Sequence, residues 1–219
     1  MRTPGLLWIA APLWYVLCEA IAASAFPGYS YATFYISDLG VPEIGDFQGR
    51  SLDSPLHAVM NAGFLGTGLL FFLGLALLTR TLPRGLATGA LVVLGAVHTV
   101  GISLVGLVPG SMANLANGLI RFHAIGAIAA IAGGNLAAIV SARPLRRLGR
   151  WRFVGPILGG LGLVCGVLLS LHVGFPDGVW ERGAVYPFMA WQLLTGIALW
   201  RLESATNPVD GPEIATLRS

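Results

Sequence analysis

Six long apolar stretches dominate the chain and restrict it to very few folds. They cover about residues 6–26, 57–79, 86–108, 119–140, 153–175 and 184–202. Each contains roughly the 20 apolar residues that a helix needs to cross a bilayer. Each is also too long and too continuously apolar for a strand of a membrane barrel. The sequence therefore predicts an all-α fold, a polytopic transmembrane six-helix bundle formed by a single domain, residues 1–219.

The composition agrees with this class and excludes two others. Of 219 residues, 55% are hydrophobic and only 11% are charged, whereas a soluble domain carries roughly a quarter charged residues. The 13 basic residues are all arginines, and they lie in short segments between the apolar stretches. Because no basic domain is present, we expect no nucleic-acid partner.

The distribution of the arginines predicts an orientation. Alternate connections fall on opposite sides of the membrane, and one side collects Arg2, Arg80, Arg84, Arg143, Arg146, Arg147, Arg150, Arg152, Arg201 and Arg218. The other side has Arg50, Arg121 and Arg182. Basic residues favour the cytoplasmic side of a membrane protein. The sequence thus predicts a multi-pass protein of the cell (plasma) membrane with cytoplasmic N- and C-termini and a cytoplasmic tail, residues 203–219.

Glycines at intervals of four residues predict close packing of the fifth apolar stretch. Gly155 and Gly159 form one such step, and Gly162 and Gly166 form another. Small residues at this spacing let helix backbones approach each other in lipid, where dispersion drives association.

The ionisable side chains of the apolar stretches are concentrated in the outer half of the predicted bundle, and Asn61 lies one turn from His57 in the same half. Such groups are costly in a membrane and usually mark function. They predict a polar pocket that opens toward the outer leaflet and is lined by Glu19, Asp38, Asn61, His98, Arg121, His123, Glu181 and Arg182.

A long outer loop, residues 27–55, connects the first two apolar stretches. It contains several aromatic residues, which suit the membrane interface, and Pro27, Gly28, Gly40 and Pro42 indicate turns. Long ordered loops are often functional. The loop is consistent with a short helix or re-entrant cap over the pocket, and equally with an interfacial segment that only anchors the bundle.

Short motifs along the chain resemble one known family. They are Ile36–Gly40 (Ile-Ser-Asp-Leu-Gly), Asn61 before Gly63-Phe64, the turn from Gly106 to Pro109, His123, Gly178–Arg182 (Gly-Val-Trp-Glu-Arg) and Trp191. Together they are similar to the signature of an uncharacterised prokaryotic integral-membrane family, catalogued as domain of unknown function 998. The resemblance covers nearly the whole chain. It implies a six-span membrane protein and no established activity.

Binding of a membrane lipid or another small hydrophobic molecule is the leading functional hypothesis, with Glu19, Asn61, Arg121 and Arg182 as the ligand-binding residues. The arginines are suited to a phosphate or carboxylate headgroup because a guanidinium forms bidentate bonds. The first alternative is an intramembrane enzyme that acts on a lipid or hydrophobic substrate at the outer leaflet. Its general acids and bases would come from Asp38, His98, His123 and Glu181.

The second alternative is a haem or metal-binding redox protein. His57, His123 and His172 are weak candidates for a metal site, but no HxxxH or HExxH spacing occurs. We therefore expect no metal and no cofactor.

A purely structural role for the charges is the remaining interpretation. Here Glu181 and Arg182 pair with Arg121 and Asp38. In particular, we expect Arg182 to turn into the bundle toward Asp38 or Glu19, because a buried charge without a partner is strongly destabilising.

Overall fold

The computed structural model describes residues 2–206, which form an all-helical fold with one small β-hairpin. The long helices are α1 (Arg2–Ala25), α2 (His57–Thr79), α3 (Leu86–Leu107), α5 (Ile120–Val140), α6 (Val154–Leu171) and α7 (Asp177–Thr206). The shorter elements are α4 (Met112–Ala116), the 3-10 helices η1 (Ser37–Gly40) and η2 (Arg146–Phe153), and the strands β1 (Gly45–Phe47) and β2 (Arg50–Leu52). The predicted all-α class is confirmed. Most of the predicted tail, residues 207–219, lies outside the described residues.

Within the described residues, five helical segments are long and apolar enough to cross a membrane. They are α1, α2, α3, α5 and the segment Arg146–Leu171, which joins η2 to α6. Helix α7 is longer than any of them, but it contains Tyr186, Pro187 and Gln192 in its middle and is not among the five.

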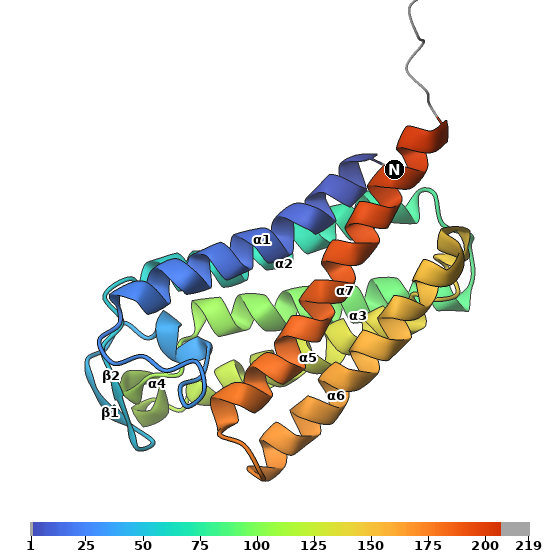
Figure 1. The fold of residues 1–219 in the computed structure, drawn as a ribbon. Helices are drawn as coiled ribbons and strands as arrows, with labels where there is room; N and C mark the ends of the chain where they lie inside the picture. The colour runs from blue at the N-terminus through green and yellow to red at the C-terminus, as the bar shows by residue number, and fades with distance from the viewer. Residues whose placement is uncertain (1, 207–219) are drawn as a thin grey trace, which may run out of the picture.

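The long helices lie side by side, and their contacts close a ring (Figure 1). In order around the ring, α1 packs against α2, α2 against α3, α3 against α5, α5 against α6, α6 against α7, and α7 against α1. The hairpin, η1 and α4 gather at one end of the helices, which we call the hairpin end. Residue 2, the α2–α3 connection and η2 lie at the other end, which we call the arginine end.

The segment between α1 and α2 is folded onto the hairpin end. Strands β1 and β2 pair antiparallel, with Phe47 opposite Arg50. Gln48 and Gly49 both have positive φ, as the two-residue turn of a tight hairpin requires. Leu39 of η1 is fully buried, and its carbonyl accepts a hydrogen bond of 2.6 Å from the Ser54 hydroxyl. Buried apolar residues and this bond fix η1 against the helices.

Glycines bring neighbouring helices into backbone contact. A Cβ placed on Gly155 or Gly159 of α6 would overlap a carbonyl oxygen of α5. The same holds for Gly101 of α3, where a Cβ would meet the backbone of α5. The close packing predicted from the spacing of the glycines in α6 is confirmed, and α3 packs on α5 in the same way.

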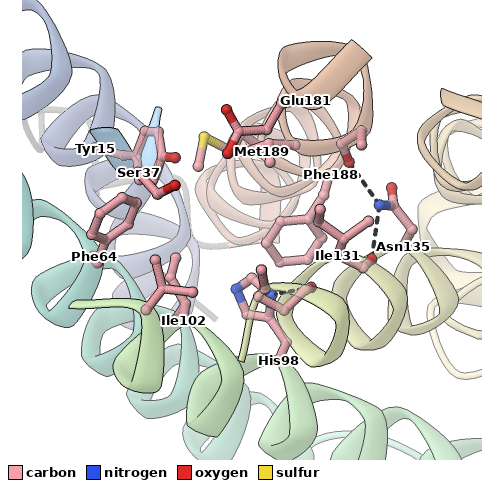
Figure 2. A pocket seen from close by; sticks show the side chains of 15 residues that line it. Tyr15, Ser37, Phe64, His98, Ile102, Ile131, Asn135, Glu181, Phe188 and Met189 are labelled. Carbon is pink, nitrogen blue, oxygen red and sulfur yellow. Dashed lines mark hydrogen bonds between the residues drawn. The ribbon is translucent and has the colours of Figure 1, made fainter. Parts of the chain in front are cut away.

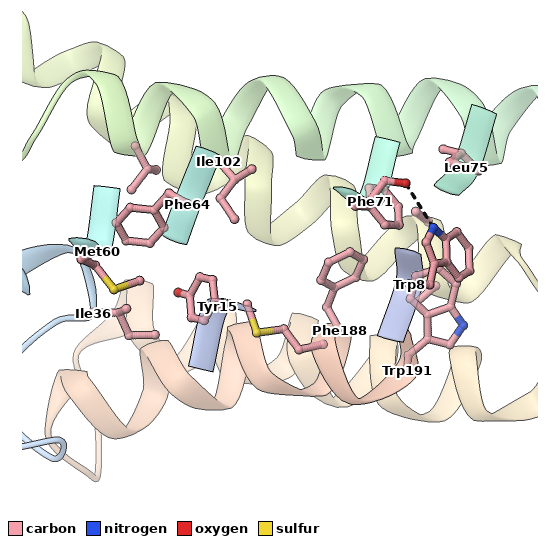
Figure 3. Close-up of a cluster of buried hydrophobic side chains, with 14 of the residues drawn as sticks. Trp8, Tyr15, Ile36, Met60, Phe64, Phe71, Leu75, Ile102, Phe188 and Trp191 are labelled. Atoms are coloured by element: carbon pink, nitrogen blue, oxygen red, sulfur yellow. Dashed lines mark hydrogen bonds between the residues drawn. The ribbon is translucent and has the colours of Figure 1, made fainter. Parts of the chain in front are cut away.

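An aromatic cluster fills the centre of the ring (Figure 3). Trp8 stacks on Phe71 with a centroid distance of 5.4 Å, and the Trp8 indole N–H donates to the Phe71 carbonyl at 3.1 Å. Trp191 and Phe188 of α7 extend the cluster toward α3. Toward the hairpin end the cluster is followed by a cavity.

Candidate functional site

The cavity lies inside the ring, between the aromatic cluster and η1. Its volume is about 50 Å³, and residues of α1, α2, α3, α5, α7 and η1 line it. Most of the lining is apolar and includes Phe64, Ile102, Ile131, Phe188 and Met189 (Figure 2). A few polar side chains interrupt this apolar wall, which is the usual composition of a small-molecule site.

His98 of α3 forms the deep end of the cavity. Its side chain is 3% exposed and packs against the rings of Phe71 and Phe188. Nδ1 lies 2.8 Å from the carbonyl oxygen of Ala130. A carbonyl can only accept, so Nδ1 carries the proton, and in the neutral ring Nε2 is left with a lone pair. Nε2 is buried and has no hydrogen-bond partner among the described residues.

Glu181 of α7 lies nearer the hairpin end of the same cavity (Figure 2). Its Oε2 accepts a hydrogen bond from the backbone N–H of Ile36, which ties α7 to the segment before η1. No described residue donates to Oε1, and no basic side chain of the described residues forms a salt bridge with this carboxylate. Glu181 is thus a carboxylate with one free oxygen.

Two hydroxyl groups join Glu181 at this end of the cavity. Tyr15 of α1 is 2% exposed, and Ser37 begins η1. Both residues line the cavity, and Figure 2 shows their hydroxyls on the side where Glu181 lies. Neither hydroxyl has a hydrogen-bond partner in the described part of the chain.

Arg182 and Glu19 form a buried ion pair beside the cavity. The Arg182 guanidinium donates to Glu19 Oε1 through Nε at 3.2 Å and through Nη2 at 3.0 Å. The Tyr186 hydroxyl also donates to this carboxylate, at 2.9 Å to Oε2. The two charged side chains are 8% and 1% exposed. The expected turn of Arg182 toward Asp38 or Glu19 is confirmed, with Glu19 as the partner.

The remaining donors of Arg182 are also occupied. Nη1 donates to the carbonyl oxygens of Tyr31, Phe34 and Gly178 at 2.7–3.1 Å, and Nη2 also bonds the Tyr29 hydroxyl. A guanidinium has five N–H groups in all, so Arg182 has no donor left for a ligand. Its contacts join α1, α7 and the segment after α1 into one unit.

Asp38 and Arg50 form a second, largely buried ion pair at the hairpin end. Arg50 Nε donates to Asp38 Oδ2 at 2.7 Å, and the backbone N–H of Tyr35 donates to the same oxygen at 2.9 Å. Burial raises the pKa of the Asp38 carboxyl above its ordinary value, although both hydrogen-bond donors oppose this shift. Arg50 lies on β2, so this pair fixes the hairpin to η1.

The other residues expected in the pocket lie outside the cavity. The Asn61 amide donates to the Gly40 carbonyl at 2.9 Å, and His123 Nδ1 bonds the Val108 carbonyl at 2.8 Å. Arg121 is exposed and lies over the ring of Phe122. Eight residues were predicted to line one pocket, and two of them, His98 and Glu181, line the cavity. The suggested pairing of Glu181 and Arg182 with Arg121 and Asp38 is wrong, because Arg182 pairs with Glu19 and Asp38 with Arg50.

The three histidines considered as metal ligands have separate partners. His57 Nδ1 bonds the Ser54 carbonyl, and His172 Nδ1 lies 2.8 Å from Asp177 at the exposed start of α7. Among residues 2–206, no three or more His, Cys, Asp or Glu side chains are grouped as a metal ion would need.

Sequence reasoning missed several buried polar residues. Tyr15 and Asn135 line the cavity, and the Asn135 amide donates to the Ala184 carbonyl at 2.8 Å. Gln192 of α7 is fully buried, and neither atom of its amide has a partner among the described residues. The sequence contains a signal that could have identified all three, since Tyr15, Asn135 and Gln192 are each a polar residue inside an apolar stretch. The prediction started from ionisable groups and added only the amide of Asn61, so it left Asn135 and Gln192 out.

These observations define a class of protein. The protein is an all-helical chain with several helices able to cross a membrane, and it is compatible with an integral membrane protein. Its charged groups tie the folded segment between α1 and α2 to the helices. Residues 9–198 match a family model described as "Protein of unknown function (DUF998)", and the chain belongs to this family. Comparisons with curated proteins and with solved structures give no significant match.

Proposed function

We propose that the protein crosses the plasma membrane six times and binds a small amphiphile in the internal cavity, in the outer half of the bilayer. In this arrangement α7 is the sixth span, the arginine end faces the cytoplasm with both termini, and the hairpin end caps the cavity on the outside. Nine arginines of the described residues lie at the arginine end: Arg2, Arg80, Arg84, Arg143, Arg146, Arg147, Arg150, Arg152 and Arg201. Their position supports this orientation by the positive-inside rule.

One observation carries the binding proposal. Four polar side chains from four elements line one apolar cavity: Tyr15, Ser37, His98 and Glu181. His98 Nε2 is buried without a protein partner, and no described residue hydrogen-bonds the two hydroxyls or Glu181 Oε1. A buried polar atom without a partner costs about 1–3 kcal/mol. A bound molecule that supplies the missing bonds removes this cost.

The chemistry of the four groups selects the ligand. In the ionised form of Glu181 its free oxygen accepts hydrogen bonds, as does the lone pair of His98 Nε2, and the two hydroxyls can donate or accept. The ligand must therefore donate. Glu181 also has no basic partner, whereas Arg182 and Arg50 are each paired with a carboxylate. A protonated amine meets both requirements, and an anionic headgroup meets neither.

The size of the cavity limits how much of the ligand it encloses. A volume of about 50 Å³ has room for roughly four water-sized groups. An amine with a short apolar segment fits, but a complete phospholipid does not. The rest of the amphiphile would extend out of the cavity between the helices.

Binding of alkyl compounds with different headgroups tests this proposal. In purified protein, n-octylamine should raise the thermal unfolding temperature in a saturable manner, whereas octanoate of the same chain length should not. Glu181→Gln keeps an acceptor for the Ile36 N–H but loses the charge. It should weaken octylamine binding about 10–100-fold, the usual effect of losing a hydrogen bond to a charged group.

Asp46→Asn is the matched control for this experiment. Asp46 is an exposed carboxylate on β1, so the variant loses one negative charge at the same end of the protein without touching the cavity. It should bind octylamine like the unaltered protein. Equal binding of octylamine and octanoate, or equal loss in the two variants, would contradict an amine site at Glu181.

Catalysis in the same cavity is the second candidate function. His98 Nε2 carries a lone pair beside apolar surface, and such a group can act as a general base. Of the expected acid–base residues, Asp38 and His123 do not line the cavity. An enzyme would convert an added amphiphile into a compound of different mass, and the conversion would stop in His98→Phe.

Labelling of single cysteines tests the orientation. In a background with Cys18→Ala and Cys165→Ala, we expect Glu43→Cys to react with a membrane-impermeant maleimide added to intact cells. Arg147→Cys should react only after the cells are opened. Labelling of position 147 in intact cells would reverse the assigned orientation.

A further inference from the structure

A groove at the arginine end has the features of a second, independent binding site. It runs between η2 and the last turns of α7 and has a volume of about 420 Å³, within the range of ligand sites. Its walls are mainly apolar, with Leu148 from η2 and Leu194, Ile197 and Ala198 from α7. Arg147 from η2 and Arg201 from α7 also line it.

Both arginines of this groove are available to a ligand. They are exposed, and neither forms a hydrogen bond or an ion pair with a described residue. By contrast, the guanidinium groups of Arg50 and Arg182 at the hairpin end are paired with carboxylates. Nine arginines lie among the described side chains at the arginine end. The groove is thus an apolar surface that carries two cationic side chains, with further arginines at the same end.

Trp151 gives the groove a position relative to the bilayer. It lies on η2, lines the groove and is 46% exposed. Tryptophan is enriched at the level of the lipid headgroups, where its ring contacts chains and its N–H contacts water. The part of the groove at η2 then lies at the level of the lipid headgroups, and the part along α7 lies at the level of the hydrocarbon chains. Along α7, Leu194 is nearly two helical turns from Arg201.

We infer that this groove binds an anionic phospholipid of the inner leaflet. The lipid phosphate is held by Arg147 and Arg201, and one acyl chain lies along Leu194, Ile197 and Ala198. A guanidinium binds a phosphate by two parallel hydrogen bonds, and basic pockets on the cytoplasmic side of membrane proteins recognise such headgroups. The apolar walls select a lipid over free phosphate, because free phosphate would leave them uncovered. The site is separate from the amine cavity and does not depend on it.

Lipid titration of the purified protein in a neutral detergent tests this site. Binding of phosphatidylglycerol and of phosphatidylcholine with the same chains is measured by native mass spectrometry. We expect phosphatidylglycerol to bind at least tenfold more tightly. Each basic residue at an anionic lipid surface contributes roughly a fivefold effect, so R147Q/R201Q should weaken this binding about 25-fold. Inorganic phosphate should not compete.

Two charge-matched variants locate the effect. R80Q/R84Q removes the same charge from the α2–α3 connection, and R143Q/R146Q removes it from the neighbouring part of the α5–η2 segment. Both should keep nearly full binding. A third variant, Ala198→Phe, fills the groove without changing the charge and should also weaken phosphatidylglycerol binding.

Three results would overturn the assignment. Equal affinity for the two phospholipids would show that the groove has no preference for charge. An equal loss in all three double variants would show a diffuse charge effect in place of a site. Competition by inorganic phosphate, with no effect of Ala198→Phe, would show an anion site that does not hold a lipid chain.

Discussion

Arg182→Ala should lower the free energy of unfolding by about 3–5 kcal/mol, the usual result of removing one partner of a buried ion pair. Glu19 would be left 1% exposed without its cation. The carbonyl oxygens of Tyr31, Phe34 and Gly178 would lose their shared donor as well. Because these carbonyls fix the segment after α1 to α7, the hairpin end should loosen with the ion pair.

Unfolding in detergent, followed by circular dichroism against added denaturant, measures this loss. Arg121→Ala is the matched control, since Arg121 is an exposed arginine at the same end and lies over the neighbouring Phe122 ring. It should change stability by less than about 0.5 kcal/mol.

A double variant separates the cost of leaving Glu19 charged without a partner from the cost of the hydrogen bonds that are lost with Arg182. In Glu19→Gln/Arg182→Met no charge is left in the interior, so this protein should be more stable than Arg182→Ala. If Arg182→Ala unfolds like the unaltered protein, the pair does not hold the loop to the helices.

The all-α class could be predicted from the sequence because it depends on local information. About 20 consecutive apolar residues leave helix as the main option in lipid, and no knowledge of neighbours is needed. The glycine steps of α6 are local in the same way, since spacing alone places Gly155 and Gly159 on one face. The direction of Arg182 was also predictable, because its burial requires a carboxylate and few exist in the chain.

The lining of the cavity could not be predicted in the same way. In a soluble helix the buried face differs from the exposed face in polarity, but in lipid both faces are apolar. The sequence therefore does not show that Tyr15 and Phe64 point into the ring, while Leu13 and Leu69 point out of it. The partner of Asp38 depended on the register of a short hairpin, which places Arg50 opposite Phe47.

Gly159→Ala should destabilise the protein by about 1–3 kcal/mol, the usual cost of overpacking a close contact. Gly159 faces α5, where a methyl group would overlap the carbonyl oxygen of Asn135. A flexible side chain could move aside, but a helix backbone cannot. The two helices must therefore separate, and they lose dispersion contacts along their whole interface, which is the main attraction between helices in lipid.

Gly160→Ala is the matched control for Gly159→Ala, because it adds the same methyl group to the adjacent residue of the same helix. A Cβ at Gly160 meets no atom within 4 Å. In a helix interior, alanine is more favourable than glycine by about 1 kcal/mol, so this variant should be as stable as the unaltered protein or more stable. Thermal unfolding of the two variants in one detergent measures the difference, and the opposite order of stabilities would contradict the packing of α6 on α5. Local propensity acts equally at both positions, so the sign of the difference isolates the contact between the helices.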